Sequence, residues 1–495
     1  MNTGFDNSVY MKMQTEEILK RVERFSHKLY LEFGGKLFDD YHAARVLPGF
    51  HVNGKILLLE ALKEKTEIII CINAADIEKG KIRADLGIPY DMDVLRLIDS
   101  IRGMGLYISS VVISLYNDQP AADRFKNRLE RRGEKVYIHR PIKGYPTDID
   151  LVVSDRGYGS NPYIETTRPL VVVTAPGPGS AKMATCLSQL YHEHKRNVKA
   201  GYAKFETFPI WNLPLNHPVN LAYEAATADL GDVNAIDPFH LEAYGETAVN
   251  YNRDIEVFPL VRNILSRIMG THAVYQSPTD MGVNMAGYCI TDDALVREAA
   301  RQEIVRRYFR TWCSYKDGSL GSGAVEKMEI IMKQLGLTPE YGLAVRPALE
   351  KSRANSCPAM ALILHGGSVV TGKTTNVLTA ASSLVLNCVK RLAGIPDSVH
   401  LIAPYVLEPM LLLKEKILRD KNPLVSLEEV LNALSICAAT DPSAEKALLE
   451  LHNLRGCNAH SSHMIAKADE AALKKLGVNV TCTPEFPSAH LYYDC

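Results

Sequence analysis

Short apolar runs alternate with helical patterns along the first 195 residues of the chain. Gln14–His27 carries apolar residues at helical spacing and predicts an amphipathic helix. The apolar runs that follow are short, β-branched and nearly continuous, as in parallel strands that are buried on both faces. The predicted strands are Lys28–Phe33, Glu67–Ile72, Tyr107–Leu115, Lys135–His139, Asp150–Val153 and Leu170–Thr174.

Helical segments separate several of these strands, and the clearest are Met92–Met104, Ala121–Arg132 and Met183–Lys195. A regular alternation of strand and helix predicts an α/β fold with a doubly wound, mostly parallel sheet and right-handed crossovers. We therefore expect residues 1–255 to form a P-loop-like or Rossmann-like α/β domain that binds phosphate.

The pattern changes after residue 200. Residues 201–254 are rich in Pro, Asn and Tyr, and we interpret them as loops over the first domain. A helical domain over residues 256–345 follows, and its predicted helices are Phe258–Met269, Asp292–Trp312 and Ala324–Leu335.

Residues 346–495 are expected to form a smaller C-terminal α/β domain. Its predicted strands are Ala359–Leu364, Val369–Thr371, His400–Ala403, His463–Ala466 and Val478–Cys482. Its predicted helical segments are Asn376–Leu392, Val406–Leu454 and Glu470–Leu476.

Composition and charge exclude several classes of function. The 56 Lys and Arg residues balance 57 Asp and Glu residues, so there is no basic excess for nucleic acid or a membrane surface. The chain starts without a signal-peptide pattern and contains no apolar run of about 18 residues. Its ten cysteines form no C-x-x-C pair, which is typical of reduced thiols. We expect a cytoplasmic protein with neither nucleic-acid nor membrane partners.

The first candidate site is the strand–loop–helix segment Thr174–Lys182. Glycines let backbone N–H groups approach an anion, and the start of the helix adds unpaired N–H groups and a partial positive charge. The lysine could reach a phosphate, and nearby hydroxyls could face phosphate or Mg²⁺. We predict a phosphorylated ligand here, with ATP or another nucleotide and Mg²⁺ as candidates. The residues expected to contact it are Gly177, Gly179, Ser180, Lys182 and Thr185.

Two positions of this segment depart from the P-loop pattern. Ala181 stands where the second Gly is expected, and Met183 stands where Ser or Thr binds the metal. Thr185 comes two places too late for that role. The alternative interpretation is a tight turn that caps a helix.

A second segment, Gly367–Thr374, matches the P-loop pattern letter for letter. Val369 and Val370 are stiff and apolar where a phosphate cradle needs small residues, so we favour a β-hairpin with a Gly-rich turn over nucleotide binding. A hairpin followed by Thr-Gly and a long helix also resembles the start of a deaminase-like fold. The zinc signature of that fold is absent from this sequence.

A third candidate follows the first two predicted strands. Gly34, Gly35 and Lys36 come after the first strand, and the basic segment Lys79–Asp85 comes after the second. Because the carboxyl ends of parallel strands border the ligand crevice in open sheets, both groups could contact phosphate. The alternative is a pair of turns with solvated lysines.

Polar loops supply the candidate catalytic residues. Asp237, Arg253 and Asp280 lie in segments dense in polar and aromatic side chains, and such loops often carry function. Either aspartate could hold a metal or act as a base, and the arginine could neutralise charge in a transition state. The alternative is loop capping by Asn and Asp side chains.

Cys457, His460 and His463 have side chains that can bind metal. No second ligand pair follows at zinc-finger spacing, so we favour histidines without a metal and assign no metal ligand.

Several long motifs resemble one bacterial family, and they are Leu29–His42, Thr174–Ser180, Phe208–Leu215, Val249–Asp254 and Ser277–Asn284. The chain is similar over essentially its whole length to the family called domain of unknown function 1846, or UPF0371. This resemblance implies no established activity, and some members carry the label ATP-dependent peptidase. The sequence has neither G-x-S-x-G nor H-E-x-x-H to support a peptidase. The usual loop of the family has Gly before its lysine, so Ala181 is a departure.

Our leading hypothesis is an enzyme that binds a nucleotide or another phosphorylated ligand and catalyses phosphoryl transfer or hydrolysis. The loop Gly177–Lys182 would hold phosphate, and Lys36 and Arg253 would add positive charge. Asp280 or Asp237 would serve a metal or act as the base. The alternatives are a non-catalytic ligand-sensing or scaffold protein and a metal-dependent hydrolase. We expect the protein to be a homo-oligomer.

Overall fold

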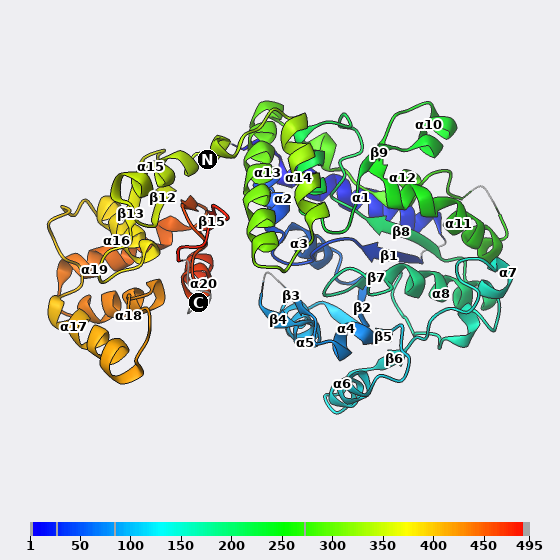
Figure 1. The fold of residues 1–495 in the computed structure, drawn as a ribbon. Helices are drawn as coiled ribbons and strands as arrows, with labels where there is room; N and C mark the ends of the chain where they lie inside the picture. Colours follow the sequence, from blue (N-terminus) through cyan, green and yellow to red (C-terminus); the bar gives the residue numbers. More distant parts are fainter. Residues whose placement is uncertain (1–2, 26–27, 84–85, 272–273, 489–495) are drawn as a thin grey trace. The chain divides into compact units, whose positions relative to one another are not determined.

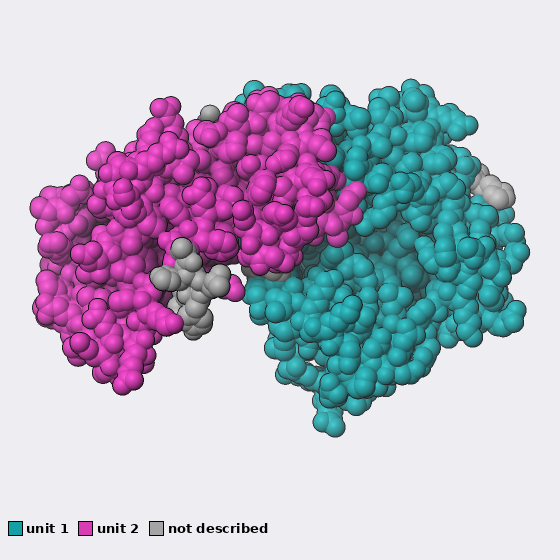
Figure 2. Space-filling view, in the orientation of Figure 1, with its two compact units in different colours: residues 1–224, 232–300 teal, residues 225–231, 301–495 magenta. Residues whose placement is uncertain are grey.

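A computed structural model describes residues 3–25, 28–83, 86–271 and 274–488 of the chain. The chain divides into two compact units (Figure 2). Unit 1 contains Met1–Glu224 and Asp232–Ala300, and unit 2 contains Ala225–Gly231 and Arg301–Cys495. Each unit has its own sheet, its own helices and its own apolar core. Within the described ranges, every helix is too short or too polar to cross a lipid bilayer.

The sheet of unit 1 has seven strands in the order β11-β8-β1-β7-β2-β5-β6, and every pairing in it is parallel. This confirms the predicted parallel α/β architecture. All residues of β1 and β7 are buried, as expected for a sheet that is covered on both faces. The strands are β1 (Leu29–Phe33), β2 (Thr66–Asn73), β5 (Tyr107–Ser114), β6 (Val136–Ile138), β7 (Leu170–Thr174), β8 (Gly201–Phe205) and β11 (Gly282–Val283).

Helices connect these strands in both directions along the sheet (Figure 1). The helices within unit 1 are α1 (Asn7–Arg24), α2 (Tyr41–Val46), α3 (Gly54–Ala61), α4 (Ala74–Glu78), α5 (Tyr90–Gly103), α6 (Pro120–Glu130), α7 (Ile149–Val152), η1 (Tyr158–Ser160), α8 (Lys182–Lys195), α9 (Pro218–Ala226, which extends into unit 2), α10 (Pro238–Tyr244), α11 (Asn252–Met269), α12 (Pro278–Met281) and η2 (Ala286–Cys289). Two small antiparallel pairs complete it, β3 (Ile82–Arg83) with β4 (Ile88–Pro89) and β9 (Asn234–Ile236) with β10 (Val249–Tyr251).

The direction of the crossovers determines which helices share a face of the sheet. The chain passes from β1 to β2 toward the β6 edge, and it passes from β7 to β8 toward the β11 edge. Because crossovers between parallel strands are right-handed, these two connections lie on opposite faces. α8 packs against β1, β7 and β8 and contacts α11.

The sheet of unit 2 has four strands in the order β13-β12-β14-β15. β12 (Ala359–Ile363) and β13 (Val369–Lys373) form an antiparallel hairpin, which confirms the interpretation of Gly367–Thr374. β14 (Asn458–Ser461) pairs antiparallel with β12 and parallel with β15 (Asn479–Cys482). The helical elements are α14 (Ser322–Gln334), η3 (Pro339–Tyr341), α15 (Val345–Asn355), α16 (Ala380–Ala393), α17 (Pro404–Leu412), η4 (Leu413–Leu418), α18 (Leu427–Cys437), α19 (Pro442–Leu449), η5 (Glu450–Leu454) and α20 (Lys467–Lys475); α13 (Asp293–Lys316) precedes them.

Four segments differ from the sequence prediction. Residues 150–153 are not a strand: residues 150–152 lie on the short helix α7 and Val153 follows its end. The Asp148 carboxylate caps this helix by accepting a hydrogen bond from the Leu151 N–H at 3.0 Å. His400–Ala403 pairs with no strand, since Pro404 starts α17 directly after it. The strand expected at His463–Ala466 is β14, which ends at Ser461.

The fourth difference lies in residues 201–254, which are not only loops. They begin with β8, a strand between β1 and β11, and they also contain α9, β9, α10 and β10. Lys204 interrupts the apolar pattern of β8, and this charge concealed a strand of which four residues are buried.

Candidate functional site

Four neighbouring parallel strands, β8, β1, β7 and β2, end at the same edge of the sheet in unit 1. The connections from β1 and β7 leave this edge over opposite faces. In open parallel sheets, ligands bind at such a point, beyond the carboxyl ends of the strands. The candidate loop, residues 175–181, lies here and joins β7 to α8.

The backbone of this loop is restricted at three positions. Gly179 and Ala181 have φ angles of 74° and 54°, in the left-handed region. A Cβ on Gly177 would come within 2.3 Å of the Tyr90 hydroxyl oxygen, so this position requires glycine. Ala181 adopts its conformation at a cost of roughly 1–2 kcal/mol, because its Cβ crowds the backbone. Such strain concentrates at functional sites.

Side chains hold the carbonyl groups of the loop. The Ser180 hydroxyl donates to the Gly177 carbonyl at 2.8 Å, and the Ser114 hydroxyl donates to the Ser180 carbonyl at 2.9 Å. The side-chain amide of Asn73 donates to the Gly179 carbonyl at 3.1 Å. Ser114 of β5 and Asn73 at the end of β2 thus hold the loop in place. These bonds occupy carbonyl oxygens of the loop and leave its N–H groups available.

The donors of the loop remain unpaired within the described part of the chain. There, the backbone N–H groups of Gly179, Ala181 and Lys182 have no acceptor, and no side chain caps α8. The half-buried Lys182 forms no ion pair with any residue in the same ranges. Unpaired N–H groups, a helix amino end and an ammonium group make this loop electropositive.

Two other residues of α8 face the interior. Thr185 is 1% exposed, and its hydroxyl donates to the Ala181 carbonyl at 3.1 Å. The Thr185 hydroxyl also accepts from the Cys71 thiol, with a distance of 3.6 Å between sulfur and oxygen. Met183 packs against the apolar core. The structure thus brings Gly177, Gly179, Ser180 and Lys182 together on the loop and turns Thr185 inward.

A group of charged residues that the sequence interpretation missed lies at the ends of β1 and β8. We call Glu32, Lys204, Glu206 and Asp254 the Lys204 cluster. The Lys204 ammonium lies 2.7 Å from Glu206 Oε1 and 2.5 Å from Asp254 Oδ2. Glu32 is opposite Lys204 in the β1–β8 register and accepts a hydrogen bond from the Tyr202 hydroxyl at 2.8 Å.

Burial and charge determine protonation in the Lys204 cluster. Burial raises the pKa of Glu206, Lys204 partly opposes this, and Asp254 raises it further, to a pKa of about 7. Burial disfavours the Lys204 ammonium, but Asp254, Glu206 and Glu32 together raise its pKa well above the usual value. The cluster therefore combines a fixed cation with a carboxyl group that is part protonated near neutral pH.

The loop and the Lys204 cluster act on the same two buried thiols, Cys71 and Cys186. Burial raises the pKa of both thiols, Lys182 lowers it and Glu32 raises it. The raised pKa keeps both thiols protonated and unreactive. Lys182 and Glu32 therefore both lie near these two thiols. An acidic residue inside the apolar strand Leu29–Phe33 was the signal that could have revealed the Lys204 cluster.

Gly34, Gly35 and Lys36 follow β1 at the same edge. Gly35 has a φ of 69°, and a Cβ there would lie 3.4 Å from the Lys55 ammonium. Lys55 is buried and pairs with Asp40 at 2.8 Å between Nζ and Oδ2. Burial tends to raise the pKa of Asp40, but the Lys55 charge brings it below the usual value. Lys36 is exposed beside this neutralised pair.

One lysine of the basic segment Lys79–Asp85 lies near the loop. The Lys81 ammonium is 5.1 Å from the centroid of the Tyr90 ring, whose hydroxyl faces Gly177. Lys81 also pairs with Asp76 at 3.4 Å. Residues 84–85 lie outside the described ranges.

Asp237 and Asp280 lie at the starts of two short helices. The fully buried Asp237 caps α10 by accepting from the N–H groups of Phe239 and His240, both at 3.0 Å. Its other oxygen accepts from the N–H and the hydroxyl of Thr279 at 3.2 and 2.7 Å. Asp280 accepts from the N–H of Gln276 at 3.0 Å. These bonds are those of caps that tie α10 to α12.

Arg253 stands at the start of α11, with 60% of its side chain exposed, and pairs with the buried Asp232 at 3.1 Å. Its neighbour Asp254 belongs to the Lys204 cluster. The structure thus places the two adjacent residues in different ion pairs, Arg253 in one with its own side chain exposed and Asp254 in a half-buried one.

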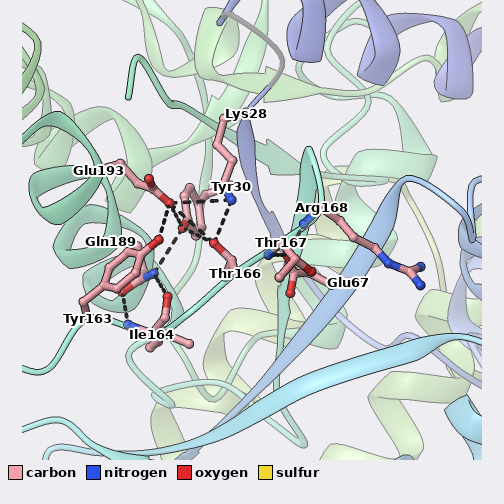
Figure 3. Close-up of polar contacts among 10 residues, drawn as sticks. All are labelled: Lys28, Tyr30, Glu67, Tyr163, Ile164, Thr166, Thr167, Arg168, Gln189 and Glu193. Carbon is pink, nitrogen blue, oxygen red and sulfur yellow. Dashed lines mark hydrogen bonds and ion pairs between the residues drawn. The ribbon is translucent and has the colours of Figure 1, made fainter. Parts of the chain in front are cut away.

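The far end of α8 is anchored by a buried polar network at the amino end of the sheet (Figure 3). Glu193 accepts from the Tyr30 hydroxyl at 2.7 Å and pairs with Lys28 at 3.6 Å. Gln189 bonds the N–H and the carbonyl of Ile164, the segment before β7, at 2.9 and 2.8 Å. These bonds hold α8 so that its other end stays beside the loop.

The candidate metal residues of unit 2 have other contacts. His460 is fully buried on β14, and its ring nitrogens lie 2.8 and 3.0 Å from the hydroxyls of Thr481 and Thr483. Burial lowers the pKa of His460 to about 3, so the ring is neutral. Among all described residues, no group of three or more His, Cys, Asp or Glu is arranged to hold a metal ion.

Comparison with known proteins gives a consistent result over the whole chain. The family model described as domain of unknown function DUF1846, N-terminal, matches residues 3–336, and the C-terminal model matches residues 340–492. A UPF0371 protein of Clostridioides difficile strain 630 is 54% identical over 501 residues, which cover all of both chains. A UPF0371 protein of Clostridium botulinum strain Kyoto is 55% identical over 502 residues, again over both full lengths. These matches confirm the resemblance seen in the sequence motifs.

Proposed function

The chain belongs to the DUF1846 family, whose function is unknown, and from this premise we propose that it is an enzyme that binds a phosphorylated small molecule at residues 175–181. The phosphate would accept hydrogen bonds from the N–H groups of Gly179, Ala181 and Lys182. Gly177 and Gly179 would leave room for it, and the Lys182 ammonium would balance its charge. The proposed reaction is phosphoryl transfer or hydrolysis.

The observation that carries this proposal is the set of N–H donors without acceptors beside an unpaired lysine. The first N–H groups of a helix have no partner within the helix and bind water, a cap or a ligand. Gly179 is exposed and Ala181 and Lys182 are half-buried, so a ligand can replace water at all three groups. Here the carbonyls of Gly177, Gly179 and Ser180 already accept hydrogen bonds from Ser180, Asn73 and Ser114, so the loop offers an anion its donors and not these acceptors. An anion relieves this imbalance, whereas a cation or a neutral ligand does not.

The Lys204 cluster supplies the groups for chemistry. A carboxyl group with a pKa of about 7, as in Glu206, can give or take a proton near neutral pH. Lys204 can stabilise negative charge that develops on a phosphoryl group. Phosphoryl transfer depends mostly on positioning and charge stabilisation, which fits a site built at the ends of parallel strands.

The residues present do not favour a nucleoside triphosphate with Mg²⁺. Met183 supplies no hydroxyl at the P-loop position that holds the metal, and Thr185 is turned inward. Among the described residues there is also no group of three or more His, Cys, Asp or Glu side chains that could hold a metal ion. We therefore place a phosphate ester that binds without a metal first among the ligands and derive no step through Mg²⁺.

Thermal unfolding of the full chain against inorganic phosphate, sugar phosphates and nucleotides tests the proposal. A ligand present at about 100 times its Kd adds about 2.7 kcal/mol of stability, so at least one of these compounds should raise the melting temperature. Lys182→Ala should weaken the binding of that compound about tenfold, because it removes a charge-assisted contact of about 1.5 kcal/mol.

Lys195→Ala is the matched control, since Lys195 ends the same helix and pairs with Asp155 on the surface. This variant should bind like the wild type. The proposal fails if no phosphorylated compound raises the melting temperature, or if both lysine variants lose affinity equally.

A further inference from the structure

Unit 2 contains a cavity of about 350 Å³ that has a marked positive character. Its lining residues come from α15, β13, α16, α17, the segment between β13 and α16 and the segment before α17. They include Lys351, Lys373, Lys390 and His400, and no carboxylate lines the cavity. Its size is at the lower end of the range for sites that bind small molecules.

The three lysines have no counter-charge within the described residues. Lys373 donates to the side-chain carbonyl of Asn355 at 2.7 Å, and Lys390 donates to the backbone carbonyl of Asp397 at 3.1 Å. Lys351 forms no ion pair there, and all three side chains are half-buried. Like charges around one partly desolvated cavity repel each other, and an anion between them would turn this repulsion into attraction.

A buried hydroxyl in the wall also lacks a partner. Ser383 on α16 is 9% exposed, lines the cavity and has no hydrogen-bond partner for its Oγ. The wall beside it is fixed, because β13 presses on α16 so closely that a Cβ on Gly372 would lie 2.2 Å from the Leu384 nitrogen.

The remaining wall is apolar. Leu378, Leu386, Leu401, Ile402 and Leu407 line the cavity together with the cations. A simple inorganic anion would satisfy the lysines but would leave this apolar surface in contact with water. A molecule with an anionic group at one end and a nonpolar group at the other matches both parts of the lining.

We propose that this cavity is a second ligand site, separate from the loop of unit 1, and that it binds a small organic anion with a nonpolar portion. The anionic group, a phosphate or a carboxylate, lies among Lys351, Lys373 and Lys390. The nonpolar portion lies against the leucines. Lys373 belongs to Gly367–Thr374, the segment that matches the P-loop pattern. In the proposed site the Lys373 side chain contacts the anion, and the backbone of the hairpin does not surround a phosphate.

Calorimetric titration of the full chain with phenyl phosphate, benzoate, inorganic phosphate and phenol tests this site. Lys182→Ala is present in every sample so that the loop of unit 1 binds phosphate about tenfold more weakly and contributes less to the measured heat. Phenyl phosphate or benzoate should bind, inorganic phosphate should bind at least tenfold more weakly, and phenol should not bind. The stronger of the first two ligands identifies the anionic group.

The double variant Lys373→Gln with Lys390→Gln should bind the organic anion at least tenfold more weakly than the wild type. Lys446→Gln, an exposed control, should leave the Kd of the anion unchanged. A second measurement avoids variants of the cavity: in the wild-type chain, the ligand should protect Lys351, Lys373 and Lys390 from acetylation, as read by mass spectrometry, and should not protect Lys446. Unchanged affinity in the double variant, absence of protection, or no binding of either organic anion would each overturn the proposal.

Discussion

At the scale of single residues, Glu206 shows how the fold can place a proton. Burial raises its pKa, Lys204 at 2.7 Å partly opposes this rise, and Asp254 adds to it. The unfolded chain has no such environment, so its Glu206 ionises near the ordinary pKa of about 4.3. Between this value and about 7, the folded protein keeps a proton that the unfolded chain has released.

The contribution of Glu206 to stability should therefore fall as pH rises from about 4.3 to about 7 and should stay constant above that range. Glu206→Gln imitates the protonated form and removes this dependence. The difference in unfolding free energy between the variant and the wild type should shift in favour of the variant by a few kcal/mol across the window. Urea unfolding at a series of pH values measures it.

Other titrating groups are shared by the two proteins and cancel in this difference. A flat difference between pH 4.5 and 7 would show that Glu206 keeps an ordinary pKa and cannot serve as the proposed acid or base near neutral pH.

At the scale of elements, apolar continuity decided what could be predicted. β1, β2, β5 and β7 read as strands because each is a nearly continuous apolar run, although Glu32 lies within β1 and Glu67 within β2. The Gly-rich loop before α8 was visible from its composition. β8 was missed because Lys204 interrupts its apolar pattern. The other four residues of β8 are buried, and Lys204 itself forms ion pairs with Glu206 and Asp254. Pairing between residues far apart in the chain cannot be read from local spacing. The loop is one continuous segment and could be predicted from its residues. The Lys204 cluster joins residues from three distant segments, so only Glu32 within an apolar strand pointed to it.

Asp237 tests whether a cap was mistaken for a catalytic group. Asp237→Ala removes the acceptor of four buried hydrogen bonds and should lower the unfolding free energy by about 3 kcal/mol or more. Asp441→Ala, at the start of α19, removes an acceptor of one cap bond and should cost only about 1 kcal/mol. Chemical unfolding of both variants gives the comparison.

If Asp237 acts only as a helix cap, Asp237→Ala should lose stability, and the molecules that remain folded should still bind ligand. A variant of Asp237 that is as stable as the wild type but inactive would instead restore the catalytic role predicted from the sequence.

At the scale of the whole molecule, two separate apolar cores divide the chain, and each unit contains one tryptophan. Trp211 lies in unit 1 beside Gly282, and Trp312 lies in unit 2 on α13. Each indole can therefore report on the unfolding of its own unit. The two proposed ligands are assigned to different units, which makes their effects separable.

Trp312→Phe leaves only Trp211, which reports on unit 1, and Trp211→Phe leaves only Trp312, which reports on unit 2. A ligand of the loop should raise the unfolding temperature that Trp211 reports. Phenyl phosphate or benzoate in the Lys182→Ala background should raise the temperature reported by Trp312. Fluorescence during heating measures both. If each ligand shifts both signals equally, the units unfold as one, and the assignment of each ligand to its own unit is not supported.

The two ends of α8 differ in a way that affects its motion. Glu193 and Gln189 clamp the last turns to the segment before β7 and to β1, while the first turn begins at a strained Ala181 and has donors without partners. A helix that is held in this way frays from one end only. We expect its first amides to exchange with deuterium from solvent quickly, the proposed anion to slow that exchange, and its last amides to exchange slowly with or without a ligand. Binding is then felt as a change in the order of one helical turn, with no need for the sheet beneath it to move.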